Sequence, residues 1–282
     1  MSFNKKILLF SFFLVIVGGF YSYKIYKNSR PKPKSIPPRE ELVVTIIPGW
    51  NLRQVADYLV KSGFASSSED VYKFTGRPAT DYRRAAFVLP KIDELKILAD
   101  KPAHVSYEGY LAPETYRVFK DASLVEVLNK IIRQRNKEIG EDIWLAVEKS
   151  GRSFFEILTM ASILEKEVKF DSDKAKVADL LWRRYDKKWA LQVDSSVHYA
   201  VNKIGTVFTT EKDRAADSLW NTYKYRGLPL GPISNPGLDS IKAALYPEKN
   251  NYWYFLTGKD GRVYYAKTLE EHNFNRARYL SF

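Results

Sequence analysis

The clearest helical pattern covers residues 154–168, where apolar side chains recur at the spacing of an α-helix. Ser153 precedes this segment and Glu156 follows three residues later, which is the arrangement of a capping box at a helix N-terminus. The pattern therefore predicts a helix that begins after Ser153 and buries one face. The apolar arc comprises Phe154, Ile157, Leu158, Met160, Ala161, Leu164 and Val168.

Two further capping boxes predict helices elsewhere. Asn51 with Gln54 opens an apolar-periodic segment that Gly63 ends. Ser123 with Glu126 opens another. Helical patterns without such a box cover residues 143–147 and 175–185.

Strand patterns are few. Leu42–Ile47 is apolar and rich in β-branched residues, and a Pro-Gly turn follows it. Tyr252–Leu256 and Arg262–Ala266 flank the turn sequence Gly258–Gly261, as the two arms of a β-hairpin do. Because helices dominate and no regular βαβ alternation is present, the predicted fold class is α+β.

The N-terminal region carries a long uncharged stretch. Ile7–Tyr23 contains 17 residues without a charge, at the short end of the range of about 17–25 that spans a membrane as a helix. Lys5 and Lys6 precede it, and no small-residue cleavage site follows. We expect a single-pass anchor in the cell inner (cytoplasmic) membrane, with a cytoplasmic tail over residues 1–6 and the body outside the cytoplasm. A cleaved signal peptide is the alternative.

The rest of the chain divides into a linker and two units. Residues 31–38 contain four prolines, so residues 24–41 are predicted to form an extended, stiff linker. The strand and helices that follow suggest a small unit over residues 42–104. The remaining residues, 105–282, form a larger unit.

The composition narrows the range of possible binding partners and cofactors. The net charge of +12 suits nucleic acid, an anionic membrane or an acidic polymer, but no basic run or nucleic-acid motif is present, so we expect no nucleic-acid binding. The absence of cysteine excludes disulfides, and three scattered histidines make a metal site unexpected. The 16 Phe, 19 Tyr and 6 Trp exceed what a core of this size needs, so some rings are expected to line a groove.

Glu165 is the first candidate for chemistry. It falls inside the apolar arc of the helix over residues 154–168, where a charged carboxylate is costly to bury. Burial would favour its protonated form, as a general acid requires. The alternative is a carboxylate at the rim of the arc that forms a salt bridge. Glu167 points to nearly the opposite side, so the two acids are not expected to act as a pair in one site.

The segment Met160–Glu167 resembles the active-site helix of the endolytic murein transglycosylases, also called the YceG-like family. Further segments of the chain resemble that family in the same order. They are residues 108–116, 191–197, 221–223, 227–233, 235–237 and 271–273. Pro48-Gly49-Trp50 resembles the start of the small LysM-like unit that precedes the family's catalytic domain. Residues 42–104 are therefore expected to be LysM-like and residues 105–282 catalytic.

The resemblance implies a lytic reaction with one catalytic carboxylate. Glu165 would protonate the oxygen between N-acetylmuramic acid and N-acetylglucosamine in a peptidoglycan glycan strand. Once ionised, it would take the proton of the muramoyl C6 hydroxyl, which closes a 1,6-anhydro ring. Neither a metal nor a cofactor is implied. The substrate is nascent glycan, and the resemblance suggests peptidoglycan synthases as partners.

Four residues downstream of the helix are implied to bind substrate. Gln192 and Asn221 can hydrogen-bond N-acetyl or hydroxyl groups, or brace their loops instead. Asp194 can orient a donor or serve as a second carboxylate, and the alternative is a cap on the helix that follows it. Tyr223 can stack or hydrogen-bond near the scissile bond.

Glu108 and Tyr110 are implied to line a cleft where the two units meet. Two other classes of protein remain open at this point. One is a non-catalytic scaffold that binds peptidoglycan. The other is a basic protein that contacts anionic lipid or nucleic acid.

Overall fold

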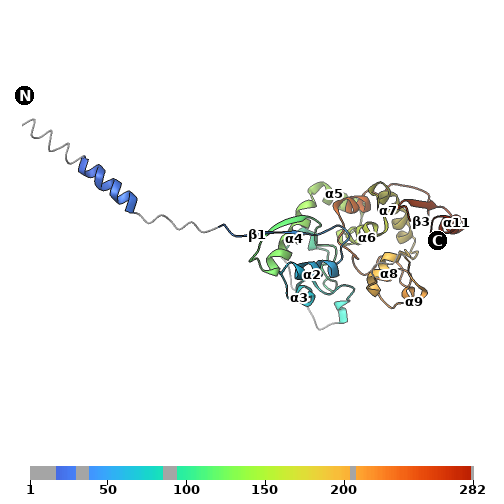
Figure 1. Ribbon diagram of the computed structural model, residues 1–282. Coiled ribbons are helices and arrows are strands. Elements are labelled where there is room, and N and C mark those ends of the chain that lie inside the picture. Colours follow the sequence, from blue (N-terminus) through green and yellow to red (C-terminus); the bar gives the residue numbers. More distant parts are fainter. Residues whose placement is uncertain (1–16, 30–37, 85–93, 204–207, 281–282) are drawn as a thin grey trace, which may run out of the picture. The chain divides into compact units, whose positions relative to one another are not determined.

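A computed structural model of the chain describes residues 17–29, 38–84, 94–203 and 208–280 (Figure 1). Residues 17–29 are helical, and Glu40–Phe282 forms a separate compact unit. Most of the predicted span over residues 7–23 and residues 30–37 of the predicted linker over residues 24–41 lie outside the described residues. Residues 24–29 of that linker are helical and not extended. Among those that are described, no helix is both long enough and apolar enough to cross a membrane.

The described part of the compact unit is mostly helical with a few short strands, which confirms the predicted mixture of elements. Its helices are α2 (Leu52–Lys61), α3 (Ser68–Thr75), α4 (Leu124–Glu138), α5 (Glu141–Ser150), α6 (Phe154–Glu167), α7 (Asp171–Asp186), α8 (Asp194–Val201), α9 (Glu211–Arg214), α10 (Leu238–Leu245) and α11 (Leu269–Tyr279), with 3-10 turns at Tyr82–Arg84 and Lys96–Leu98. Its strands are β1 (Glu41–Thr45), β2 (Thr115–Phe119), β3 (Tyr254–Thr257) and β4 (Val263–Ala266).

All three predicted capping boxes are present, at the N-termini of α2, α4 and α6. In each box the side chain before the helix accepts a hydrogen bond from the third helical N–H, and the third side chain accepts one in return. These local contacts satisfy N–H groups that the helix itself leaves free, and they therefore fix where each helix begins.

The strands form two antiparallel pairs. β3 and β4 make the predicted hairpin, with Tyr254 opposite Ala266. β1 pairs with β2, with Glu41 opposite Phe119. This pairing joins a strand of the predicted small unit to a strand of the predicted larger unit, and Glu40–Phe282 forms one compact body.

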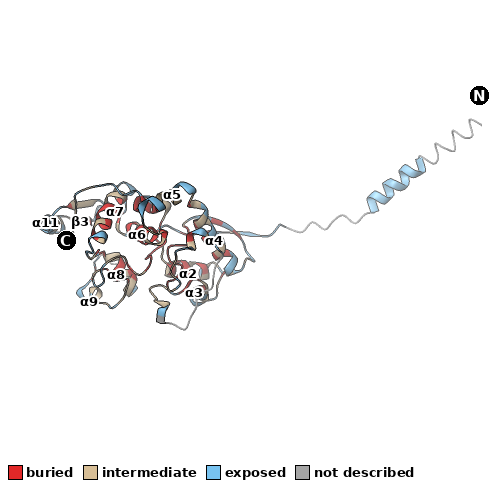
Figure 2. Ribbon diagram, turned by 180° about the vertical axis from the view of Figure 1, so that it is seen from behind, coloured by how far each residue is buried: buried red, intermediate tan, exposed pale blue. Residues whose placement is uncertain are grey.

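Helix α6 lies at the centre of this body, where its ribbon is largely red in Figure 2. Every residue from Ile157 to Leu164 is buried, including the polar Thr159 and Ser162. The helix is therefore buried on all sides rather than on the single face predicted, because α7, α8 and α10 all pack against it. Its first turn, at Phe155 and Glu156, and its last turn, with the two acids, are the parts that reach solvent.

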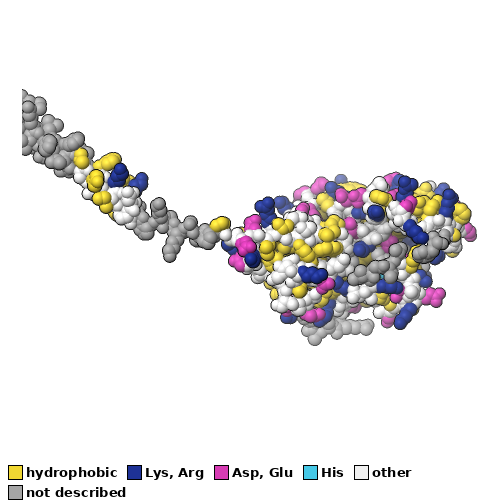
Figure 3. Space-filling model, viewed as in Figure 1, with side chains coloured by type: hydrophobic (Ala, Val, Ile, Leu, Met, Phe, Trp, Pro, Cys, Tyr) yellow, Lys and Arg dark blue, Asp and Glu magenta, His cyan; other side chains and the backbone are white. Residues whose placement is uncertain are grey.

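Lys and Arg side chains are spread over the face shown in Figure 3, with Asp and Glu side chains between them. This distribution agrees with the absence of a basic run in the sequence.

Candidate active site

Glu165 lies in the last turn of α6 with 12% of its side chain exposed. Its Oε2 accepts hydrogen bonds from the backbone N–H of Gly237, at 3.0 Å, and from Oγ of Ser240, at 2.6 Å. The ammonium of Lys174 lies 3.6 Å from the same oxygen. Gly237 precedes the first turn of α10, whose helix dipole also favours a negative charge there. These contacts match the salt-bridge alternative for Glu165 and connect α6 to α10.

The turn between β1 and α2 covers the side chain of Glu165. A Cβ atom on Gly49 would lie 3.5 Å from Cγ of Glu165, so the two already stand in close contact. The N–H of Gly49 donates to the carbonyl oxygen of Asn235 at 2.9 Å, which holds this turn in place. Glu165 is thus enclosed between the turn and the start of α10.

Glu167 faces a different set of residues, as the helical spacing predicted. Its Oε1 accepts a hydrogen bond of 3.0 Å from the backbone N–H of Ser195, in the first turn of α8. Burial raises the pKa of Glu167, and the nearby negative charge of Asp194 adds to the rise. Burial and Asp194 thus favour the protonated form of Glu167, while hydrogen bonding by Ser195 favours the ionised form.

Asp194 and Tyr223 stand beside Glu167. Oδ1 of Asp194 accepts hydrogen bonds from the hydroxyl of Tyr223, at 2.8 Å, and from that of Thr209, at 2.6 Å. Burial and the carboxylate of Asp194 raise the pKa of Tyr223, so its hydroxyl stays protonated and can donate. Two sequence segments singled out for chemistry, residues 191–197 and 221–223, therefore converge on Glu167. We call Glu167, Asp194 and Tyr223 the acid cluster.

The structure excludes the capping alternative for Asp194. Helix α8 begins at Asp194 itself, Val193 stands at the cap position, and no side chain caps this end. The first turn of α8 receives the carboxylate of Glu167 instead.

Gln192 and Asn221 occupy contrasting environments. Gln192 is exposed, and its backbone has a left-handed φ of 56°, which is uncommon for a residue with a side chain. Asn221 is fully buried, and its amide donates to the carbonyls of Arg214 and Ala216 at 2.9 and 2.8 Å. The structure leaves Gln192 available to a ligand. It places Asn221 in the bracing role, contrary to its predicted place among substrate-binding residues.

Glu108 does not line a cleft, because only 1% of it is exposed. Its carboxylate accepts hydrogen bonds from the N–H of Leu52 at 2.9 Å, the hydroxyl of Tyr199 at 2.9 Å and the side-chain amide of Asn235 at 3.1 Å. Burial raises the pKa of Glu108 to about 7. The predicted substrate contact is corrected to a structural one, since this carboxylate joins the N-terminus of α2 to α8 and to the segment before α10.

Tyr110 is also fully buried, and its hydroxyl has no hydrogen-bond partner among the described residues. Its ring meets that of Tyr107 edge-on, with centroids 6.4 Å apart. The structure therefore places Tyr110 in the core and not on a cleft wall.

Asn235 has a positioning role that sequence reasoning missed. Its Oδ1 accepts from the N–H of Leu111 at 3.0 Å, and its Nδ2 donates to the carbonyl of Trp50 at 3.0 Å. In the sequence, this position appeared only within residues 235–237, a segment that resembles the family. Ser240 and Lys174, the partners of Glu165, carried no sequence signal, because their role exists only through contacts between distant helices.

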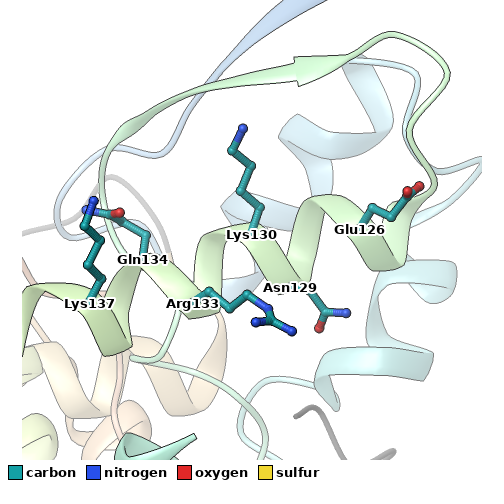
Figure 4. Close-up of a pocket in the computed structure, with 6 residues that line it drawn as sticks. All are labelled: Glu126, Asn129, Lys130, Arg133, Gln134 and Lys137. Atoms are coloured by element: carbon teal, nitrogen blue, oxygen red, sulfur yellow. The ribbon is translucent and has the colours of Figure 1, made fainter.

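A shallow depression on the outer face of α4 is the subject of Figure 4. It shares no residue with the acid cluster, and its one acid, Glu126, caps α4. The six residues around it are Glu126, Asn129, Lys130, Arg133, Gln134 and Lys137. Within the described residues, no group of three or more His, Asp or Glu side chains is placed to hold a metal ion.

The fold and the site thus define a mixed α/β protein with two partly buried acids at the end of a central helix. The family model of the YceG-like family matches residues 23–278, and the chain belongs to this family. A relative from Bacillus subtilis (strain 168), an endolytic murein transglycosylase, is 41% identical over 175 residues, which are 62% of this chain and 48% of the relative.

A relative of the same name from Streptococcus pneumoniae serotype 2 (strain D39) is 27% identical over 254 residues, covering 86% of this chain and 46% of the relative. The crystal structure of a yceG-like protein from Listeria monocytogenes is similar with a TM-score of 0.68 at 36% identity, covering 82% of this chain and 75% of that one. The chain spans about half the length of the curated relatives it matches.

Proposed function

We propose that this chain is a peptidoglycan lytic transglycosylase that cuts glycan strands internally, between N-acetylmuramic acid and N-acetylglucosamine. The product end is a 1,6-anhydro-N-acetylmuramic acid. One observation carries the proposal: the partly buried carboxyl of Glu167 has a raised pKa and lies beside Asp194 and Tyr223. The activity named for the Bacillus and Streptococcus relatives supports the same substrate.

The reaction needs one group that first gives and then takes a proton. Protonated Glu167 donates its proton to the glycosidic oxygen, and the bond from that oxygen to C1 of the muramoyl ring breaks. The C6 hydroxyl oxygen of the same ring then bonds to C1, and its proton passes to ionised Glu167. No water is consumed, and the acid is ready for another cycle. The N–H of Ser195, which donates to Glu167, stabilises the ionised carboxylate between the two steps.

Glu165 was the acid predicted from the sequence, and it remains the rival assignment. Two hydrogen-bond donors and the ammonium of Lys174 already surround its Oε2. These contacts with α10 and with Lys174 of α7 hold the side chain away from a substrate. We therefore assign the proton transfer to Glu167 and a positioning role to Glu165.

The test compares Glu167→Gln with Glu165→Gln in the full chain, using purified peptidoglycan and mass spectrometry of the products. Wild type should release anhydro-muropeptides. Glu167→Gln should lose roughly 100- to 10,000-fold in rate, as expected for a missing general acid. Glu165→Gln should keep activity within about tenfold but unfold at a lower temperature. The reverse pattern would restore Glu165 as the acid.

The same assay separates the other classes of function. A hydrated end in place of the anhydro end would indicate a hydrolase, which usually needs a second carboxylate. Binding of glycan with no released product would indicate a scaffold.

The pH dependence of cleavage is a further test. Because the pKa of Glu167 is raised, kcat/KM of a true lytic enzyme should fall as pH rises through the pKa of this carboxyl group.

We also propose that the body acts outside the cytoplasm, tethered to the inner membrane by residues 7–23, with a LysM-like unit near its N-terminal side. The uncharged stretch and the Pro48-Gly49-Trp50 sequence support these proposals. Peptidoglycan synthases are the partners proposed, since the substrate is nascent glycan. Membrane fractionation followed by protease treatment of intact spheroplasts tests the topology, and resistance of the body to protease would refute it.

A further inference from the structure

The turn between α7 and α8 is built from unusual backbone. Lys188 and Gln192, four residues apart, both have left-handed φ angles, 57° and 56°. Residues with a Cβ atom seldom adopt this conformation, and it persists only where the surrounding contacts enforce it. Trp189 lies inside this turn and is 44% exposed.

Buried Arg184 enforces the geometry of the turn. Its guanidinium donates to the carbonyl of Leu191 at 2.9 Å and to the carbonyl of Trp253 at 2.8 Å. The N–H of Trp189 in turn donates to the carbonyl of Arg184 at 2.8 Å. One buried cation therefore fixes the turn to the residue that precedes β3.

Trp189 and Trp253 form a contacting pair of indoles, which we call the tryptophan pair. Their ring centroids are 5.0 Å apart and their planes are tilted by 40°. The guanidinium carbon of Arg183 lies over Trp253, 4.5 Å from its centroid. The contact with Trp253 restricts the ring of Trp189, yet much of Trp189 stays open to solvent. A large apolar ring held in this way offers a rigid surface to a ligand.

The tryptophan pair is connected to the acid cluster at both ends. Exposed Gln192 lies three residues after Trp189, and Asp194 lies five residues after Trp189. Trp253 leads into β3, and Thr257 at the far end of this strand donates from its hydroxyl to the carbonyl of Glu167 at 2.7 Å. The four residues of β3 span roughly 13 Å at about 3.3 Å each, which is longer than one sugar ring.

We propose that the tryptophan pair is a further subsite, where a sugar ring of the glycan strand beyond the two reacting rings stacks on Trp189. This inference rests on the proposed function. A pyranose ring has an apolar face of C–H bonds, which packs favourably on an indole. Arg183 and exposed Lys187, whose ammonium is 5.9 Å from the Trp253 centroid, add positive charge. That charge complements the carboxylates of the peptide stems and of muramoyl groups that carry no stem.

The experiment measures binding with the full chain carrying Glu167→Gln, so that strands are not cut. Two ligands are compared: purified long glycan strands, and a tetrasaccharide that reaches little beyond the scissile bond. Trp189→Ala and Trp189→Leu should each weaken binding of long strands roughly tenfold, while Trp189→Phe should restore most of it. Binding of the tetrasaccharide should not change. Tyr246→Ala, which removes another exposed ring (54%), serves as the matched control and should bind both ligands normally.

With Glu167 intact, Trp189→Ala should raise KM for long strands and leave kcat unchanged. Unaltered binding of long strands by Trp189→Ala and Trp189→Leu would overturn the subsite, as would an equal loss for both ligands. Thermal unfolding of each variant identifies a loss of fold, and whichever of Trp189→Ala and Trp189→Leu stays folded decides. Failure of the proposed function is a separate outcome: wild type would then release no anhydro product, whatever Trp189 does to binding.

Discussion

Three glutamates of this protein differ in role because their neighbours differ. Glu165 meets two donors and a cation at one oxygen, which hold its side chain in place. Glu167 meets one N–H and the negative Asp194. Glu108 is fully enclosed and meets uncharged donors. At the residue scale, the balance of desolvation, charge and hydrogen bonding sets the protonation state, and no property of glutamate alone does.

The pH dependence of stability should reveal the buried carboxyl of Glu108. Its pKa is raised to about 7 in the folded protein from an ordinary 4.5. A raised pKa means that the folded state binds the proton of Glu108 more tightly than the unfolded state does. The resulting stabilisation of the fold is complete below pH 4.5 and is lost as pH rises through 7. Between these values the free energy of unfolding should fall by about 3 kcal/mol more in wild type than in Glu108→Gln. Urea unfolding of both proteins across this pH range measures the difference.

Parallel curves for wild type and Glu108→Gln would contradict this prediction. A matched control is Glu69→Gln, because Glu69 lies near the surface of α3 and pairs there with Arg77. That substitution should change the pH dependence little.

At the scale of elements, α6 is fixed by contacts at both ends. Its N-terminal box joins Ser153 and Glu156, and the other oxygen of Glu156 accepts from the hydroxyl of Tyr185 in α7 at 2.7 Å. Its C-terminal turn reaches α10 through Glu165 and α8 through Glu167. The helix can therefore hold the acid cluster in a constant position while its middle fills the core.

Ser153→Ala should weaken the fold and spare the chemistry. Loss of the cap should lower the free energy of unfolding by about 1 kcal/mol. Because Ser153 lies at the opposite end of α6 from Glu167, kcat for glycan cleavage should stay near the wild-type value. Urea unfolding and the product assay measure the two effects, and Ser123→Ala at the equivalent box of α4 is the control. A large fall in kcat with normal stability would show that this end of α6 also acts on the site.

At the scale of the whole molecule, segments far apart in sequence meet around α6. β1 pairs with β2, the turn at Gly49 bonds to Asn235, and Glu108 connects α2 to α8. Gly109 follows Glu108 in the place where these segments meet, which we call the junction, and it has a φ of +87°. A Cβ atom there would lie 2.8 Å from Pro232 and 3.2 Å from Leu158.

Gly109→Ala should therefore destabilise the protein more than Gly63→Ala does. Both glycines have a left-handed backbone, with φ of +87° and +81°, but a Cβ atom on Gly63 would meet nothing within 4 Å. Gly63→Ala should cost about 1 kcal/mol from backbone strain alone. Gly109→Ala adds a steric clash and should cost roughly 1–3 kcal/mol more. Thermal and urea unfolding measure both, and equal losses would mean that the junction relaxes without strain.

The sequence by itself determined the local elements and the family. The capping boxes at Ser153, Ser123 and Asn51 and the hairpin at Gly258–Gly261 were predictable, because caps and turns depend on residues a few positions apart. It also placed Glu165 and Glu167 on opposite sides of one helix. The ordered motifs indicated the YceG-like family.

Only the tertiary structure decided what each acid faces. Whether Glu165 or Glu167 meets donors, a cation or another carboxylate depends on contacts with α8 and α10, whose bonding residues are 28 to 75 positions away. For the same reason Glu108 and Asn221, expected at the substrate, are buried. Periodicity along one helix gives the direction of a side chain, but the groups packed against it come from distant segments, and those groups set its charge and its access to solvent.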